Sequence, residues 1–355
     1  MAPQHPSPHS TSSTTTASAQ AKRSGAWLVG GMLMALLAVV IIIVGIVQAV
    51  QSTHNTATSG HQPAIVEQSN GHSATHLSDP ALAVIVDAAS LPAGGPYTER
   101  GTGEFVTDPL RVAPSMEASA AATPGQGAPN SVADAVAAAT LGAVTIPYTI
   151  DIEGGINTSH IGGRDVFAWW VHSALGDPRG WVSGGRRSFH QFDTVGLAAL
   201  QKEPTGVGAD LRKTALHFTL ATPLTTRKLC GYTLPVETSC WSPQTRRVVI
   251  NLARFVRGAA TFSHDLAGYR YYVINHELGH GLGFGHEVCG AANGTAPVMM
   301  QQTLALRNTI VAKLEPSLSR APGFSASFTC QPNPWPNPEN VVAATLPELP
   351  VSETP

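Results

Sequence analysis

One stretch of eleven residues constrains this chain more than any other: His276-Glu277-Leu278-Gly279-His280-Gly281-Leu282-Gly283-Phe284-Gly285-His286. Residues four apart lie on one face of a helix, so the imidazoles of His276 and His280 can reach the same metal ion. Gly283 can adopt the positive φ that ends a helix, after which the chain turns back and offers His286 as a third ligand. Glu277 lies one residue further round the helix, where it can face a metal-bound water without being a ligand. Three neutral imidazoles and one open position predict a catalytic zinc site, because structural zinc sites fill all four positions with protein ligands.

The residues around the motif predict the helix that its spacing requires, from about residue 265 to residue 282. Ser263 and Asp265 are the candidate caps at its start. An apolar stripe near the helical period is supplied by Val273, Ile274 and Leu278. The alternative is a histidine-bearing helix that holds no metal.

Beyond the third histidine the chain reads Ala296-Pro297-Val298-Met299-Met300-Gln301. A methionine turn shortly after the third histidine is the second mark of the metzincin metallopeptidases, and the two features together resemble that clan. By this resemblance Met299, or its neighbour Met300, would lie in a tight turn beneath the zinc histidines. A methionine in a loop can also fill a gap in a core, and its place after the motif favours the turn.

Four segments resemble an actinobacterial family of secreted or membrane-anchored proteins, whose domain has no characterised function and carries a metzincin-type zinc motif. They are residues 167–181 (FAWWVHSALGDPRGW), 248–254 (VVINLAR), 272–277 (YVINHE) and 332–336 (PNPWP). The resemblance implies an exported protein with an α+β fold of the zincin type: a twisted sheet, a zinc-site helix and a loop-rich C-terminal lobe. It implies no particular substrate. The run 283–287 also resembles the astacin version of the motif, although no Tyr follows the Met pair, where astacins place an extra ligand.

Residues 26–50 contain no charged side chain and form a run long enough to span a bilayer. Lys22 and Arg23 precede this run, and Glu67 is the next Asp, Glu, Lys or Arg. The positive-inside rule then predicts a single-pass protein of the cell membrane with a cytoplasmic N-terminus and an extracellular domain. The alternative is a cleaved signal peptide ending at Val47-Gln48-Ala49, although the apolar run is longer than is usual for such peptides.

The composition divides the rest of the chain. Residues 1–25 are predicted to be a disordered cytoplasmic tail, 51–88 an extracellular linker, 89–340 the zinc domain and 341–355 a disordered tail. Within the domain, residues 113–140 are rich in Ala, Ser, Pro and Gly and read as a surface insertion or mobile loop. Strands are predicted over 145–152, 216–221 and 248–253, and a helix over 164–175. Charged residues are only 12% of the chain and form no basic stripe, so no nucleic-acid partner is expected.

Four cysteines suit an oxidising compartment and allow three pairings. Proximity in the sequence favours Cys230–Cys240 and Cys289–Cys330, and the second bond would hold the loops that carry the methionine turn. The alternative for Cys289, three residues after the motif, is a fourth zinc ligand. Such a ligand would close the site to substrate.

These features together predict a membrane-anchored extracellular zinc metallopeptidase that acts on a protein or peptide, cell-wall peptides included. The metal would be held by His276, His280 and His286, and Glu277 would serve as general base and then general acid. Two alternatives remain open at this point. One is a zinc-binding surface domain used for adhesion or scaffolding without catalysis, and the other is a zinc amidase that acts on a cell-wall linkage.

Overall fold

The computed structural model describes residues 80–109, 131–140, 142, 144–232 and 234–340. The predicted cytoplasmic tail, the predicted span over 26–50, most of the linker and the C-terminal tail therefore lie outside the described residues. Within the described part, none of the helices combines the length and apolar composition that a bilayer crossing needs.

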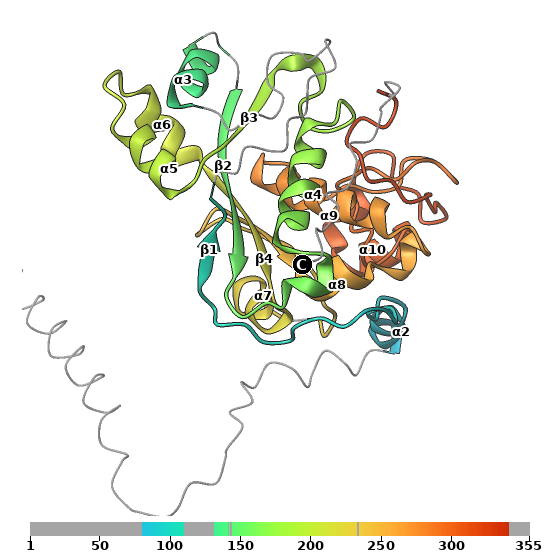
Figure 1. Ribbon diagram of the computed structural model, residues 1–355. Helices are drawn as coiled ribbons and strands as arrows, with labels where there is room; N and C mark the ends of the chain where they lie inside the picture. Colours follow the sequence, from blue (N-terminus) through green and yellow to red (C-terminus); the bar gives the residue numbers. More distant parts are fainter. Residues whose placement is uncertain (1–79, 110–130, 141, 143, 233, 341–355) are drawn as a thin grey trace, which may run out of the picture. The chain divides into compact units, whose positions relative to one another are not determined.

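A six-stranded mixed sheet organises the described part (Figure 1). Its strands are β1 Phe105–Thr107, β2 Val144–Glu153, β3 Arg187–Gln191, β4 Leu216–Ala221, β5 Cys240–Ser242 and β6 Arg247–Asn251. The order is β1-β2-β4-β6-β5, and β3 pairs with the first half of β2. Strands β2, β3, β4 and β6 run parallel, whereas β1 and β5 pair antiparallel with β2 and β6.

The described α-helices are α2 Pro80–Ala88, α3 Val132–Thr140, α4 Arg164–Gly176, α5 Thr194–Gln201, α6 Val207–Thr214, α7 Pro223–Cys230, α8 Leu252–Arg257, α9 Leu266–Gly281 and α10 Asn308–Leu314. Short 3-10 helices cover Thr158–Ile161, Ser183–Gly185, Ala260–Phe262 and Pro316–Arg320. The fold is therefore mixed α/β, with helices packed on both faces of the sheet.

The main core lies between one face of the sheet and the helices α4 and α9. Successive side chains of a strand point to opposite faces, and in β2 the side chains of Ile150 and Ile152 are buried in this core. Helix α9 contributes Val273, Ile274 and Leu278, the apolar stripe expected from the sequence. This packing fixes the orientation of α9 relative to the sheet, and so the direction in which its histidines point.

The opposite face of the sheet is covered at its two ends by separate groups of helices (Figure 1). Helices α3, α5 and α6 form a small apolar cluster beside the start of β2, and α7 packs on β5 and β6 at the other end. The middle of this face carries polar side chains, among them Thr149 and Asp151 of β2.

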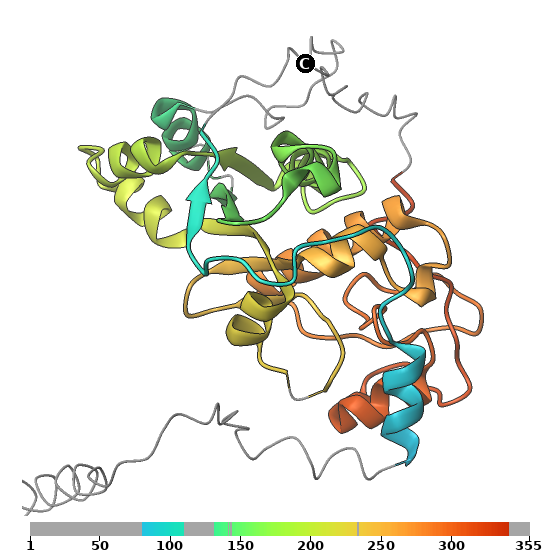
Figure 2. The same ribbon diagram turned by 60° about the horizontal axis from the view of Figure 1, so that its bottom comes forward.

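Two predicted boundaries differ from the structure. The predicted insertion 113–140 includes helix α3, whose Ala135 is fully buried in the cluster with α5 and α6. The predicted linker 51–88 includes helix α2, whose Ile85 is buried. The chain after α2 runs across the domain to β1 in both views (Figures 1 and 2). It is held there in part by Arg254, whose fully buried guanidinium donates to the Ala89 carbonyl at 2.5 Å.

The other predicted elements agree closely with the structure. The predicted helix 164–175 is α4, and the predicted strands 145–152 and 216–221 are β2 and β4. The predicted strand 248–253 is too long, because β6 ends at Asn251 and helix α8 begins at Leu252. The Asn251 side chain accepts a hydrogen bond from the Ala253 amide at 2.9 Å and caps that helix.

Candidate metal centre

Helix α9 positions the first two histidines. Asp265 is its N-cap and accepts a hydrogen bond from the Gly268 amide at 2.7 Å. Ser263, the other predicted cap, lies outside the helix at a φ of 55°. The helix ends at Gly281, and Gly283 then adopts a φ of 95°, as the sequence predicted.

The turn after Gly283 brings the third histidine to the first two. One nitrogen of each of His276, His280 and His286 lies within 4.8 Å of the others. The Nε2 atoms of His280 and His286 are 3.2 Å apart. Two nitrogens that each lie 2.0–2.1 Å from a tetrahedral ion are about 3.3 Å from each other. The spacing in this chain therefore suits one tetrahedral ion held by all three imidazoles.

The far side of each ring is fixed by a hydrogen bond from its Nδ1. His276 donates to the Val298 carbonyl at 2.8 Å, and His280 donates to the Phe284 carbonyl at 2.9 Å. His286 donates to Oε2 of Glu315 at 2.6 Å. Because Nδ1 carries the hydrogen in each ring, each Nε2 keeps a lone pair that a metal can bind.

Burial keeps His276 and His280 neutral near pH 7. It lowers the pKa of His276 to about 3, with a further contribution from the neighbouring His280. Burial also lowers the pKa of His280. A metal must compete with protons for a histidine nitrogen, so rings that stay neutral near pH 7 are ready to bind one.

Glu277 lies in the same cleft as the histidines, and its side chain is buried. Burial raises the pKa of Glu277 to about 8, and a backbone hydrogen bond from Trp241 acts in the opposite direction. The carboxyl group can therefore take up and release a proton near neutral pH, a property required of a general acid–base group.

The two methionines after the motif point into different cores. The Met300 amide donates to the Pro297 carbonyl at 3.0 Å and closes a tight turn, whose Val298 carbonyl is the acceptor for His276. Met299 belongs to the main core with α9, whereas Met300 belongs to a second core in the C-terminal part. The Tyr272 hydroxyl of α9 donates to the Met300 carbonyl at 3.0 Å and ties the turn to the helix. Met299 is thus the methionine that packs against α9, where its sulfur lies next to Gly279.

Three residues of the site were not anticipated from the sequence. Glu315, the acceptor for His286, follows that histidine at a distance of 29 residues and belongs to no motif. The side-chain Nε2 of Gln301 lies 3.2 and 3.3 Å from the two ring nitrogens of His286, and its buried Oε1 has no hydrogen-bond partner among the residues that the structure describes. Trp241 reaches the site from β5. Of these three residues, only Gln301 could have been found from the sequence, because it directly follows the Met pair.

The histidines and Glu277 open into a cleft of about 1000 Å³. Its walls include strand β5, the chain between Cys230 and Cys240, and the segment that carries Phe284. The Phe284 ring is 40% exposed and stacks on Trp181 at a centroid distance of 4.7 Å. The cleft is therefore wide enough for a chain-like ligand, with apolar surface near the histidines.

Both predicted disulfides are present, Cys230–Cys240 and Cys289–Cys330. The first forms part of the cleft wall, and the second closes the C-terminal core beside the methionine turn. Cys289 is consequently no fourth metal ligand, because its sulfur is bonded to Cys330.

Comparison with known proteins identifies a family for this chain, and the description of that family states no function. No curated protein and no solved structure shows significant similarity to this chain. The family model described as "Protein of unknown function (DUF3152)" matches residues 113–338, more than half of the chain, and the chain therefore belongs to that family.

Proposed function

We propose that this protein is a zinc metallopeptidase of the metzincin type. The observation that carries the proposal is the arrangement of His276, His280 and His286, whose ligand nitrogens lie within 4.8 Å of one another in the cleft that Glu277 also lines. Three histidine ligands and an open fourth position are the ligand set of catalytic zinc. No free cysteine is found in the described part of the chain, and the two carbonyls and the carboxylate that accept from the histidine Nδ1 atoms are of the kind that orient zinc-binding histidines.

Bound zinc would supply a Lewis acid that polarises the scissile carbonyl and lowers the pKa of a bound water. The Glu277 carboxylate would remove a proton from the attacking water while the water oxygen forms a bond to the carbonyl carbon. The same carboxyl would then give that proton to the leaving amine as the C–N bond breaks. The carbonyl of Val298 and the carboxylate of Glu315 would hold the His276 and His286 rings in the orientation that binding requires.

The edge of the sheet favours a peptide as the substrate. Strand β5 ends the sheet, pairs with β6 on one side only among the described strands, and lines the cleft beside Glu277. An extended peptide can add to such an edge through main-chain hydrogen bonds. This edge supports the peptidase over an amidase that would recognise a glycan-linked amide.

We also propose that the domain works outside the cell, anchored by residues 26–50. The two disulfides support an oxidising compartment, where such bonds persist. The uncharged run with Lys22 and Arg23 before it supports a cytoplasmic N-terminus.

The proposed function is tested by incubating the zinc-loaded full-length protein with a peptide library and with peptidoglycan. Peptidase activity predicts a reproducible set of cleaved peptide bonds that is lost on chelation. Release of products from peptidoglycan alone would indicate the amidase instead. Bound zinc without any cleavage would indicate an adhesion or scaffolding domain.

A further inference from the structure

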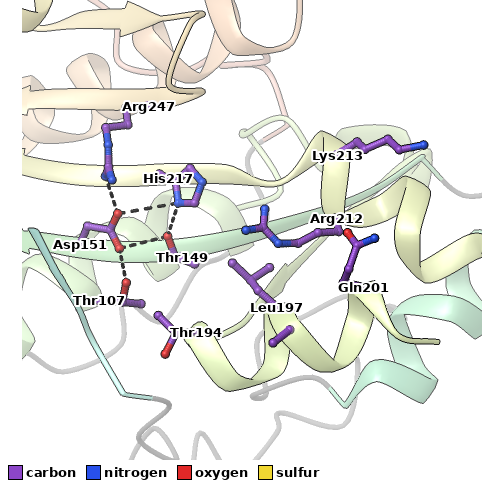
Figure 3. Close-up of a pocket in the computed structure, with 11 residues that line it drawn as sticks. Thr107, Thr149, Asp151, Thr194, Leu197, Gln201, Arg212, Lys213, His217 and Arg247 are labelled. Atoms are coloured by element: carbon purple, nitrogen blue, oxygen red, sulfur yellow. Dashed lines mark hydrogen bonds and ion pairs between the residues drawn. The ribbon is translucent and has the colours of Figure 1, made fainter.

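A second cavity, of about 490 Å³, lies on the face of the sheet opposite helix α9 (Figure 3). Its floor is formed by Thr149 and Asp151 of β2, His217 of β4 and Arg247 of β6. In β2 these floor residues alternate with the isoleucines that pack towards α9, so the sheet separates this cavity from the histidine cleft. The volume is within the range of small-molecule sites.

The charges of the floor are already paired with one another. Asp151 is almost fully buried and accepts hydrogen bonds from Arg247, from the Thr107 hydroxyl at 2.9 Å and from the Thr149 hydroxyl at 3.1 Å. Arg247 donates in addition to Thr219 at 2.7 Å. The carboxylate of Asp151 therefore leaves little capacity to bind a cation, and its charge is balanced by Arg247.

The wall of the cavity carries donors without partners. Arg212 of α6, together with Gln201 and Thr194 of α5, lines the cavity, and none of these three side chains forms a hydrogen bond or ion pair with any described residue. Figure 3 shows the Arg212 side chain reaching over Leu197 towards His217 and Thr149.

Arg212 is the cation of this cavity that has no counter-charge. Lys213 pairs with Asp210 at 2.9 Å in an exposed ion pair, and its side chain points away from the floor in Figure 3. The nearby Asp193 is engaged as the N-cap of α5, where it accepts a hydrogen bond from Gly196. Among the described residues the cavity thus combines the unpaired guanidinium of the half-buried Arg212 with an exposed amide and an exposed hydroxyl, above a neutralised floor.

We propose that this cavity binds a small organic molecule through a phosphate or carboxylate group. The planar guanidinium of Arg212 can form two parallel hydrogen bonds with such an oxyanion. The Thr194 hydroxyl and the Gln201 amide supply further donors. A bare phosphate would fill only part of the cavity, so the anion is expected to carry an organic body that contacts Leu197 and the sheet.

The test measures anion binding to the full-length protein by calorimetry at constant ionic strength, with inorganic phosphate, glycerol phosphate and succinate as separate probes. Two variants remove the same charge from adjacent residues, Arg212→Gln and the control Lys213→Gln. Hydrogen bonds to charged groups contribute enough that Arg212→Gln should weaken binding about tenfold or more. Lys213→Gln should bind each probe as tightly as the parent does. If glycerol phosphate binds more tightly than succinate, the preferred anionic group is a phosphate, and the reverse order indicates a carboxylate.

Two results would overturn the proposal: no saturable binding of any probe, or equal weakening by Arg212→Gln and Lys213→Gln, which indicates general charge attraction only. Thermal unfolding of both variants checks that they fold. Arg212→Lys gives a second measurement, because it keeps the charge without the planar fork and should bind more weakly than the parent. Metal content should not change in any of these variants, so the result is independent of the histidine cleft.

Discussion

A Cβ atom on Gly279 would lie 2.3 Å from Sδ of Met299 and 2.9 Å from the ring of Trp181. Gly279 lies in α9 between Glu277 and His280, so its missing side chain lets Met299 approach the helix closely within the histidine motif. The same turn places the Val298 carbonyl at 2.8 Å from Nδ1 of His276.

Gly279→Ala is therefore expected to destabilise the fold although Ala favours helices. Overpacking a core costs about 1–3 kcal/mol, which exceeds the helix-propensity gain of about 1 kcal/mol. The control is Gly176→Ala in α4, where an added Cβ meets nothing within 4 Å. Urea denaturation should show a loss of stability for Gly279→Ala alone, and equal stability of the two variants would contradict the close contact with Met299.

Glu315→Ala is expected to weaken metal binding by about 10–100-fold, the usual effect of losing an acceptor behind a metal-bound histidine. The substitution leaves all three histidines in place and removes only the partner of His286 Nδ1. Glu287→Ala is the control, because Glu287 is next to His286 in sequence and its carboxylate makes no hydrogen bond to a ligand within the described part. Competition with a fluorescent zinc chelator measures both affinities, and an equal loss in the two variants would rule out a specific role for Glu315.

Glu277→Gln is expected to change how the stability of the metal-free protein depends on pH. The pKa of Glu277 is about 8 in the folded chain and near 4.5 when unfolded, so between pH 6.5 and 8 this group binds more protons in the folded state and its contribution to stability falls as the pH rises. The lowered pKa values of the buried histidines act in the opposite direction over the same window, because these groups bind more protons in the unfolded state; they are His172, His190, His217, His276 and His280. The difference in stability between the parent and Glu277→Gln, measured by denaturation in the presence of a chelator, should therefore fall by about 1.5 kcal/mol between pH 6.5 and 8. A difference that stays constant over this window would contradict the raised pKa of Glu277.

Removal of Cys289–Cys330 is expected to cost more stability than removal of Cys230–Cys240. The two bonds span sequence separations of 41 and 10 residues, for which chain entropy gives about 4 and about 3 kcal/mol. Both sulfurs of the longer bridge are also buried in the C-terminal core. Double Cys→Ser variants of each pair, compared by thermal unfolding, measure the order, and the reverse order would contradict it.

Local sequence was sufficient to predict the parts of the site that depend on helix geometry. The four-residue spacing of His276 and His280 and the positive φ of Gly283 follow from the helical period and from glycine's freedom. The order of β2, α4 and β4 followed from apolar periodicity in the same way.

Contacts between distant segments could not be predicted in this way. Helix α3 is rich in alanine and carries no clear apolar period, so its burial depends on α5 and α6. The chain just after helix α2 is held to the domain by Arg254, which donates to the carbonyl of Ala89. These two residues are 165 positions apart in the sequence. Glu315 reaches His286 only because α10 and the following turn fold back beside the methionine turn.

Proton transfer by Glu277 at a metal held by the three histidines is tested by metal analysis and peptide cleavage on the same preparations. Glu277→Gln removes the proton carrier and no ligand, so this variant should keep one zinc per chain and lose cleavage by at least about 10²–10⁴-fold. His286→Ala removes a ligand, so zinc content and cleavage should both fall. Cleavage by Glu277→Gln at the parent's rate, or a parent protein that holds no zinc after purification with excess metal, would show that the protein is not a metallopeptidase of this kind.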